Sequence, residues 1–216
     1  MTVQTTTDGR SRGRGVSRRR TATYVGILFL VQMATAIAGT SQIDAFVADG
    51  GAEAAPTVGV LLMMCSGLAV VGIGLLMYPV LKSVNARLAL WYPILRISEF
   101  IVSAACGVYL LVQLQVVPNH LLWVYVPTGL GGLILTYLLF VARLVPRPIA
   151  ALGLVGYAAL TAGVPLDLLG VLDMNEGPGQ AVLAPGGLFE FVFLPIWLIA
   201  KGFRPTAGEA RSGADL

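Results

Sequence analysis

Residues 57–80 read TVGVLLMMCSGLAVVGIGLLMYPV, a continuous apolar run that holds no charged side chain. At about 1.5 Å per residue, a helix of this length crosses the hydrocarbon core of a bilayer, which is roughly 30 Å thick. The composition of the chain agrees, because only 12% of its 216 residues are charged and 56% are hydrophobic. Soluble domains average about 25% charged residues. The run therefore predicts a transmembrane helix in a membrane protein.

Five further apolar runs are long enough to cross a bilayer, the last of them barely. They cover about 22–39, 91–115, 121–142, 148–171 and 184–200. We therefore predict an all-α fold, a polytopic membrane helical bundle of six transmembrane helices, formed by residues 22–203. Residues 1–21, rich in Thr, Gly and Arg, are predicted to be a disordered basic cytoplasmic tail, and residues 204–216 a flexible cytoplasmic tail.

The basic residues are distributed asymmetrically. All but one of the 14 lie in the N-terminal tail, in the loops after the second and fourth predicted helices, or after the sixth. Because basic loops stay in the cytoplasm, this pattern predicts a multi-pass protein of the cell membrane with both termini cytoplasmic. It also accounts for the net charge of +3 without a nucleic-acid partner. A signal peptide cleaved after Ala38 is the alternative, and it would leave five helices.

Two residue types that often mark function are scarce. The chain has one His, His120, and two Cys, Cys65 and Cys106, both in apolar stretches. This set is too small and too scattered for a zinc site or a disulfide framework. We expect neither a metal nor a cofactor.

Glycines are frequent within the predicted helices, as at Gly129, Gly131 and Gly132 and at Gly153 and Gly156. They lack the Lys-Ser/Thr partner and the preceding strand of a phosphate-binding loop. Small residues at such positions let membrane helices approach closely. We therefore assign these glycines to helix packing.

Ionisable side chains inside a bilayer are costly and usually face the protein interior or a wet cavity. Three acids, Glu99, Asp167 and Glu190, and one base, Arg96, lie within the predicted helices. The third helix repeats polar residues at three- and four-residue spacing, which gives it a polar face that includes Arg96 and Glu99. These two are one turn apart, so they form either a structural ion pair or a site in which a carboxyl group is tuned for proton transfer.

The depths of the acids in their helices indicate which could meet. Glu99 lies about 12 Å from the cytoplasmic end of its helix and Glu190 about 9 Å from the outer end of the sixth, so both could reach one cavity near the midplane. Asp167 is shallower, and it is either a third site residue or an interfacial acid at a helix end. The candidate catalytic residues are thus Glu99, Glu190 and Asp167. The candidate substrate-binding residues are Arg96, Tyr92, Ser103, Gln32, Tyr157, Phe193 and Trp197.

Four stretches carry a resemblance to a known family. They are ATYVGILFLVQMATAIAG (22–39), WYPILRISEF (91–100), RLVPRPIAALGLVGY (143–157) and LFEFVFLPIWLIAKGF (188–203). Together they resemble a bacterial six-helix membrane family catalogued as a domain of unknown function. That resemblance covers residues 22–203 and implies no activity.

In size, helix count and membrane acids the chain is also similar to small integral-membrane terpene cyclases of actinobacteria. That resemblance implies cyclisation of a prenylated small molecule in the membrane. The DxDD signature of soluble class II cyclases is absent, so no residue role is carried over from it. Such chemistry needs a protonated buried carboxyl, a dry apolar cavity and aromatic faces that stabilise cations.

Three functions remain open at this point. The first is a protonation-initiated terpene cyclase whose partners are a lipophilic prenylated substrate and membrane lipid. The second is a small proton or solute transporter that uses the same acids as a relay. The third is a non-enzymatic membrane assembly protein in which the buried charges fix helix packing. A closed apolar pocket beside the acids would favour the first, and a path open to both faces the second.

Overall fold

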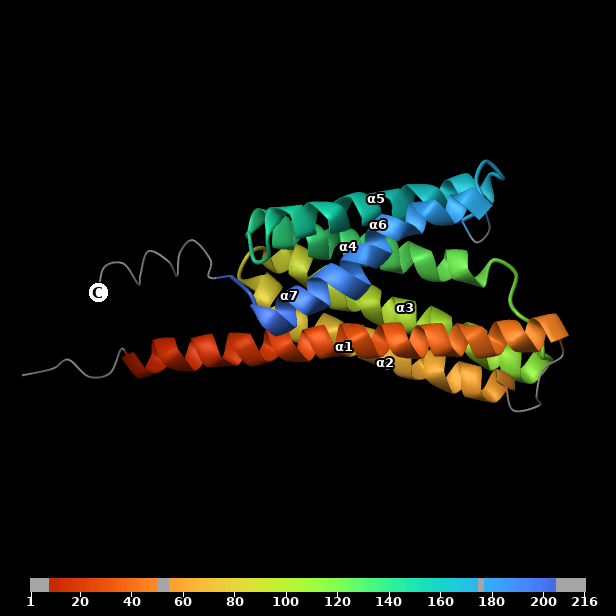
Figure 1. The fold of residues 1–216 in the computed structure, drawn as a ribbon, viewed down its shortest axis with the longest axis horizontal. Coiled ribbons are helices and arrows are strands. Elements are labelled where there is room, and N and C mark those ends of the chain that lie inside the picture. Colours follow the sequence, from red (N-terminus) through yellow and green to blue (C-terminus); the bar gives the residue numbers. More distant parts are fainter. Residues whose placement is uncertain (1–7, 50–54, 175–176, 205–216) are drawn as a thin grey trace, which may run out of the picture.

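The computed structural model describes residues 8–49, 55–174 and 177–204, and it contains helices and no strand over these residues. The predicted all-α fold is confirmed. Figure 1 shows five long helices side by side with a broken helical segment crossing them. The long helices are α1 (Asp8–Asp49), α2 (Ala55–Lys82), α3 (Ala86–Gln113), α4 (His120–Val141) and α5 (Arg147–Leu168).

All five long helices contain a stretch apolar enough to cross a membrane. The sixth predicted span is the shorter segment Ala184–Ala200. The chain is therefore a multi-pass membrane protein. Its last segment is the apolar run whose length is barely enough to cross a bilayer.

That last segment changes helix type along its length. A short 3₁₀ helix, η1 (Gly177–Leu183), leads into α6 (Ala184–Gly187), the π-helix η2 (Leu188–Phe193) and α7 (Leu194–Ala200). The Leu194 N–H donates to the Phe189 carbonyl five residues back, which is the π-helical pattern. The position of Pro195 explains it: a proline has no N–H and its ring clashes with the carbonyl four residues before it. The wider turn relieves that clash.

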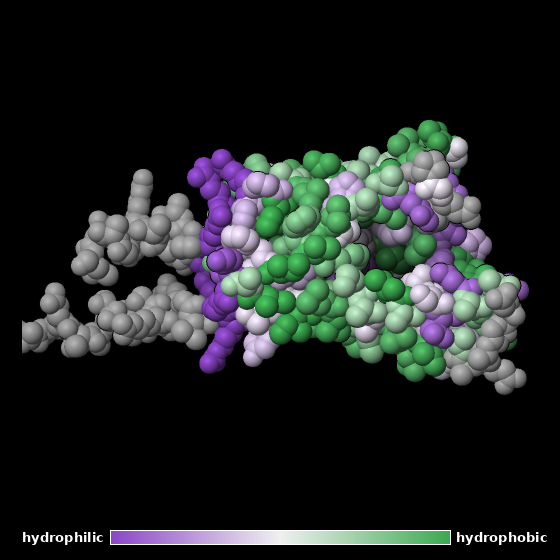
Figure 2. All heavy atoms as spheres, in the orientation of Figure 1, coloured by the Kyte–Doolittle hydropathy of each residue, from purple (hydrophilic) through white to green (hydrophobic). Residues whose placement is uncertain are grey.

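The helices form a ring. Each of α1 to α5 packs on the next one in the chain, α6 packs on α5, and α7 packs back on α1, which closes the ring. In Figure 1, α7 crosses α1 near one end, while α6 follows α5 away from α1 toward the other end. Figure 2 shows a recess in the surface between α1 and α6 in that second half. The bundle is thus closed at the end where α7 packs on α1. Toward the other end, α1 and α6 separate and leave an opening on one side (Figure 2).

The first helix begins earlier than the sequence predicts. We predicted residues 1–21 to be disordered, but α1 already begins at Asp8; residues 1–7 and 205–216 lie outside the described part. No proline interrupts residues 8–21, and extending a helix is easier than nucleating one, so the apolar run carries the helix into the basic segment. Arg19 then donates from Nη2 to the carbonyls of Ile199 (3.0 Å) and Ala200 (3.1 Å), which caps the end of α7.

Hydrophilic side chains gather at the end of the bundle where α1 enters and α7 leaves (Figure 2). The antiparallel order of the helices brings the loops after α2 and α4 to this same end, and the Arg204 N–H donates to the Leu144 carbonyl there at 2.8 Å. We call it the basic end. Its basic residues are Arg18, Arg19, Arg20, Lys82, Arg87, Arg143, Arg147, Lys201 and Arg204.

Close approach through glycine is clearest where α5 meets α6. A Cβ atom on Gly156 would run into the backbone of Pro185 and Gly186. Backbone atoms cannot rotate aside as a side chain can, so this contact requires glycine. The packing role predicted for Gly153 and Gly156 is therefore confirmed at Gly156.

Gly156→Ala should destabilise the protein by about 1–3 kcal/mol, which is the usual cost of overpacking. Gly187→Ala is the matched control, because its added Cβ would meet only Phe191 at 3.9 Å, an ordinary contact. Thermal unfolding of both variants in detergent measures the effect. Equal unfolding temperatures would contradict the packing described for α5 and α6.

Candidate functional site

The centre of the ring holds a buried guanidinium. Arg96 on α3 is only 1% exposed, and its Nη1 donates to Glu99 Oε2 at 2.8 Å. An ion pair was one of the two alternatives left open by their spacing, and the structure shows this contact. Gly74 of α2 leaves the room for the Arg96 stem, because a Cβ there would come within 3.2 Å of Arg96 Cβ.

Glu190 of η2 approaches the same guanidinium from the last helical segment of the bundle. Its Oε1 lies 3.6 Å from Arg96 Nη2, which is an ion-pair distance but not a hydrogen bond. Tyr157 Oη donates to Glu190 Oε2 at 2.6 Å, and Gln32 Nε2 donates to Glu190 Oε1 at 3.2 Å. The structure thus brings together two predicted acids and two predicted binding residues around Arg96.

A sixth side chain completes the group. The ring of Tyr92, which is fully buried, lies 5.4 Å from the Arg96 guanidinium carbon. We call Gln32, Tyr92, Arg96, Glu99, Tyr157 and Glu190 the Arg96 cluster. Its members come from α1, α3, α5 and η2, and all but Tyr92 lie near the middle of their spans.

Two local features bring the cluster together. The Tyr157 ring lies directly against Gly132 of α4, where a Cβ would clash with it. Phe189 packs edge-on to Tyr157, with 6.1 Å between ring centres. The π-helix holds Phe189 and Glu190 toward the interior, where both are buried.

The same π-helix explains why Phe193 lies outside the Arg96 cluster. The sequence predicts that Phe193 and Trp197 share the face of Glu190, assuming a regular helix. The π turn shifts the register, and Phe193 is 44% exposed on the outside of the bundle. Trp197 is half-buried and stacks with Arg204 at 5.3 Å near the basic end.

Asp167 also lies outside the cluster. It is half-buried near the end of α5, and its Oδ2 accepts a hydrogen bond from the Met174 N–H at 2.6 Å. It therefore fixes the turn that follows α5, which matches the interfacial alternative. Ser103, one turn beyond Glu99 on α3, is half-buried.

The sequence analysis missed Ser66. This residue of α2 is 7% exposed, and its Oγ donates to the Gln32 carbonyl at 3.2 Å. It supports the turn of α1 that carries the Gln32 side chain. Its signal was a hydroxyl side chain in the middle of the long uncharged run that forms α2.

Several buried polar atoms lack a hydrogen-bond partner among the described residues. Four belong to the Arg96 cluster: Gln32 Oε1, Tyr92 Oη, Arg96 Nε and Arg96 Nη2. Buried polar groups are normally bonded, so each such group needs an explanation. A cluster that only tied helices together would be expected to satisfy them.

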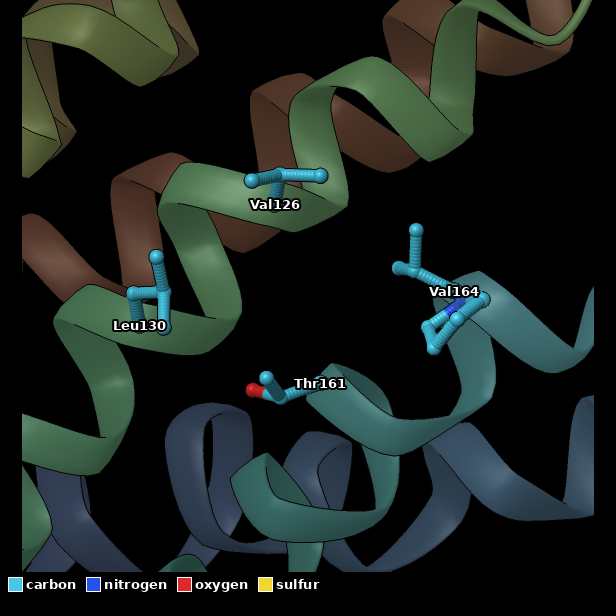
Figure 3. A pocket seen from close by; sticks show the side chains of 5 residues that line it. Val126, Leu130, Thr161 and Val164 are labelled. Carbon is cyan, nitrogen blue, oxygen red and sulfur yellow. The ribbon is translucent and has the colours of Figure 1, made fainter. Parts of the chain in front are cut away.

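A cavity of about 220 Å³ lies between α4 and α5, apart from the cluster. Figure 3 shows its lining, which consists of Val126, Leu130, Thr161, Val164 and Pro165. The Thr161 hydroxyl is already bonded to the Tyr157 carbonyl at 2.7 Å. The cavity is half-open and its lining contains no acid and no aromatic ring, so it differs from the acid-lined midplane cavity that the sequence predicts.

Metal binding finds no support in the described part of the chain. It contains no group of three or more His, Cys, Asp and Glu side chains that could hold a metal ion. The two carboxyl groups that do meet, Glu99 and Glu190, share a guanidinium.

The fold and the site define a polytopic membrane protein with an ionic cluster at its centre. A family model described as "Domain of unknown function (DUF4386)" matches residues 24–119 and residues 106–202. The chain belongs to this family, which confirms its predicted membership of a membrane family of unknown function. No curated protein matches the chain, and no solved structure does.

Arg96→Met should destabilise the protein by about 3–5 kcal/mol, because removing one partner leaves buried carboxyl groups unpaired. Adding Glu99→Gln to that variant should recover part of the loss. Arg87→Met, at an exposed position of the basic end, is the control. The measurement is reversible unfolding in mixed detergent micelles, and an Arg96→Met protein as stable as the control would refute the central role of this ion pair.

Proposed function

We propose that this protein is an integral-membrane terpene cyclase, an isomerase that cyclises a prenylated small molecule by protonating it. Glu190 is the proton donor in this proposal. The observation that carries it is the pair of buried carboxyl groups, Glu99 and Glu190, around a single guanidinium. One guanidinium neutralises one carboxylate, so the cluster is neutral when it holds one proton, and neutrality is strongly favoured in a membrane.

We assign this proton to Glu190 because its contact with Arg96 is the longer of the two. Arg96 donates a 2.8 Å hydrogen bond to Glu99, whereas its distance to Glu190 is 3.6 Å. Glu99 is then the counter-ion of Arg96, and Glu190 is the acid. Tyr157 and Gln32 fix the orientation of the Glu190 carboxyl group.

The reaction balances without any further reactant. Glu190 gives its proton to an alkene carbon, the resulting cation is attacked by a second alkene of the same chain, and a carbon–carbon bond closes the ring. The final cation returns a proton to the Glu190 carboxylate, so the product is an isomer of the substrate. The Glu190 carboxylate and the nearby rings of Tyr157 and Phe189 stabilise the cation while it exists.

Access from the bilayer supports a lipophilic substrate. The recess between α1 and α6 (Figure 2) opens on the side of the bundle, and Gln32 of α1 meets Glu190 of η2 by a 3.2 Å hydrogen bond in the closed part. A prenyl chain dissolved in the membrane would approach the acid along this route.

An assembly role is the second candidate. The 2.8 Å Arg96–Glu99 bond favours it, since this pair alone could neutralise both groups for purely structural reasons. It does not account for Glu190 or for the unbonded donors of Arg96. The effect of removing the Glu190 acid separates the two candidates.

Glu190→Gln keeps the shape of the side chain and removes the acid. We expect it to abolish the isomeric cyclised product when membranes are incubated with farnesylated acceptors, and to leave expression close to normal. Asp167→Asn is the matched control and should retain product, because Asn still accepts the Met174 hydrogen bond. Product is followed by chromatography and mass spectrometry. Full cyclase activity in Glu190→Gln would exclude Glu190 as the proton donor. If the wild-type protein cyclises no substrate of a broad panel, that result would count against the proposal that the protein is a cyclase.

We further propose that the basic end faces the cytoplasm of a cell membrane, with both termini inside, because basic loops are retained there. A green fluorescent protein fused to the C-terminus should then fluoresce. Alkaline phosphatase fused after Leu172, at the opposite end, should be active. The reverse pattern would invert the orientation.

A further inference from the structure

Three hydrogen-bond donors converge on the centre of the Arg96 cluster without a partner. They are Arg96 Nε, Arg96 Nη2 and the Tyr92 hydroxyl; none makes a hydrogen bond of normal geometry with a described residue, and the nearest carboxylate oxygen to Nη2 that forms an ion pair is Glu190 Oε1 at 3.6 Å. Their side chains are 1% and 0% exposed, so bulk water does not satisfy them. Leaving such donors empty is unfavourable, because each has lost its hydrogen bonds to water.

The unbonded atoms of Arg96 form one edge of its planar group. Nη1 is used by Glu99, while Nε and Nη2 present two parallel N–H bonds on the edge that remains. This edge is the geometry by which arginine grips an oxygen acceptor. The backbone of Gly131 borders this edge, because an added Cβ there would be in ordinary contact with Nε at 3.9 Å.

The charge of the surroundings selects the kind of acceptor. Glu99 lies 2.8 Å from the guanidinium and Glu190 lies 3.6 Å from it. An anionic ligand would be repelled by these carboxyl groups, whereas a neutral carbonyl oxygen accepts hydrogen bonds and adds no charge. Of the four unbonded atoms of the cluster, three can donate a hydrogen bond, whereas Gln32 Oε1 can only accept one.

We propose that Arg96 and Tyr92 bind a neutral carbonyl oxygen of the lipophilic substrate. The inference rests on the proposed function, in that it names the substrate class of the same site: a prenyl chain attached to a carbonyl-bearing head group. Arg96 and Tyr92 hold the head group, and the chain extends toward the Glu190 acid. Because the donors are enclosed, the ligand reaches them when the Gln32–Glu190 contact between α1 and η2 opens.

Binding of non-reacting probes tests this directly. The probes are farnesylacetone, the hydrocarbon with CH₂ in place of its carbonyl, and a farnesyl carboxylic acid of matched length. Their affinities for the full-length protein in lipid nanodiscs are measured by equilibrium dialysis. The wild type should bind the ketone at least about tenfold more tightly than the hydrocarbon, as one or more hydrogen bonds would give.

Two variants assign the preference to this site. Tyr92→Phe removes one donor and keeps the ring, and it should lower the ketone preference by about tenfold. Gly131→Ala adds a methyl group in ordinary contact with its neighbours and close to Nε, and it should weaken ketone binding while the protein still folds. Tyr137→Phe is the control, since Tyr137 is 47% exposed on α4. The infrared carbonyl band of the bound ketone should shift to lower frequency in the wild type and shift less in Tyr92→Phe.

Equal binding of ketone and hydrocarbon, or a preference unchanged by both variants, would overturn the inference. Tighter binding of the carboxylic acid than of the ketone would also overturn it, in favour of an anion site. These outcomes are separate from the cyclase test, because the probes report binding alone. A selective ketone site without any cyclisation would leave this inference standing and refute the enzyme.

Discussion

The Arg96 guanidinium is enclosed at mid-depth in a bundle whose interior is otherwise largely apolar. A charge at the centre of a bilayer costs about 2.5–3.5 kcal/mol by insertion measurements. Glu99 offsets that cost from the same helix, while Glu190, Gln32 and Tyr157 approach from three other elements. The positions of α1, α5 and η2 therefore depend on one cation, and so does the closure of the ring by the last segment.

Pro195 and the ionic cluster together account for the shape of the sixth segment. A regular helix through residues 188–193 would carry Glu190 and Phe193 on one face, but the π turn before Pro195 separates them. Glycine at Gly132 and Gly156 lets α5 pack closely on α4 and on α6, so that Tyr157 reaches the carboxyl group. An irregular helix and close packing together form a site that a straight helix would not provide. π-Helical turns are frequent at functional sites in proteins.

Hydropathy and charge spacing were enough to predict the all-α bundle and its membrane-spanning helices, and they gave the Arg96–Glu99 ion pair as one of two alternatives. They also predicted that Glu190, Gln32 and Tyr157 are site residues, because polar groups in lipid must find one another. They did not predict the π turn, whose proline effect depends on the segment's packing, so the prediction for Phe193 assumed the wrong register. Asp167 bonds its own loop, and sequence spacing alone does not separate that role from a catalytic one.

In the proposed function Arg96 neutralises Glu99, and Glu190 is the acid that gives up its proton. Infrared spectroscopy of the protein in lipid membranes tests this most directly, because a protonated carboxyl group has a band distinct from that of a carboxylate. We expect the wild-type spectrum to show one band of a buried protonated carboxyl group. This band should be lost in Glu190→Gln and retained in Glu99→Gln. A wild-type spectrum without that band, or a band that disappears only in Glu99→Gln, would contradict it.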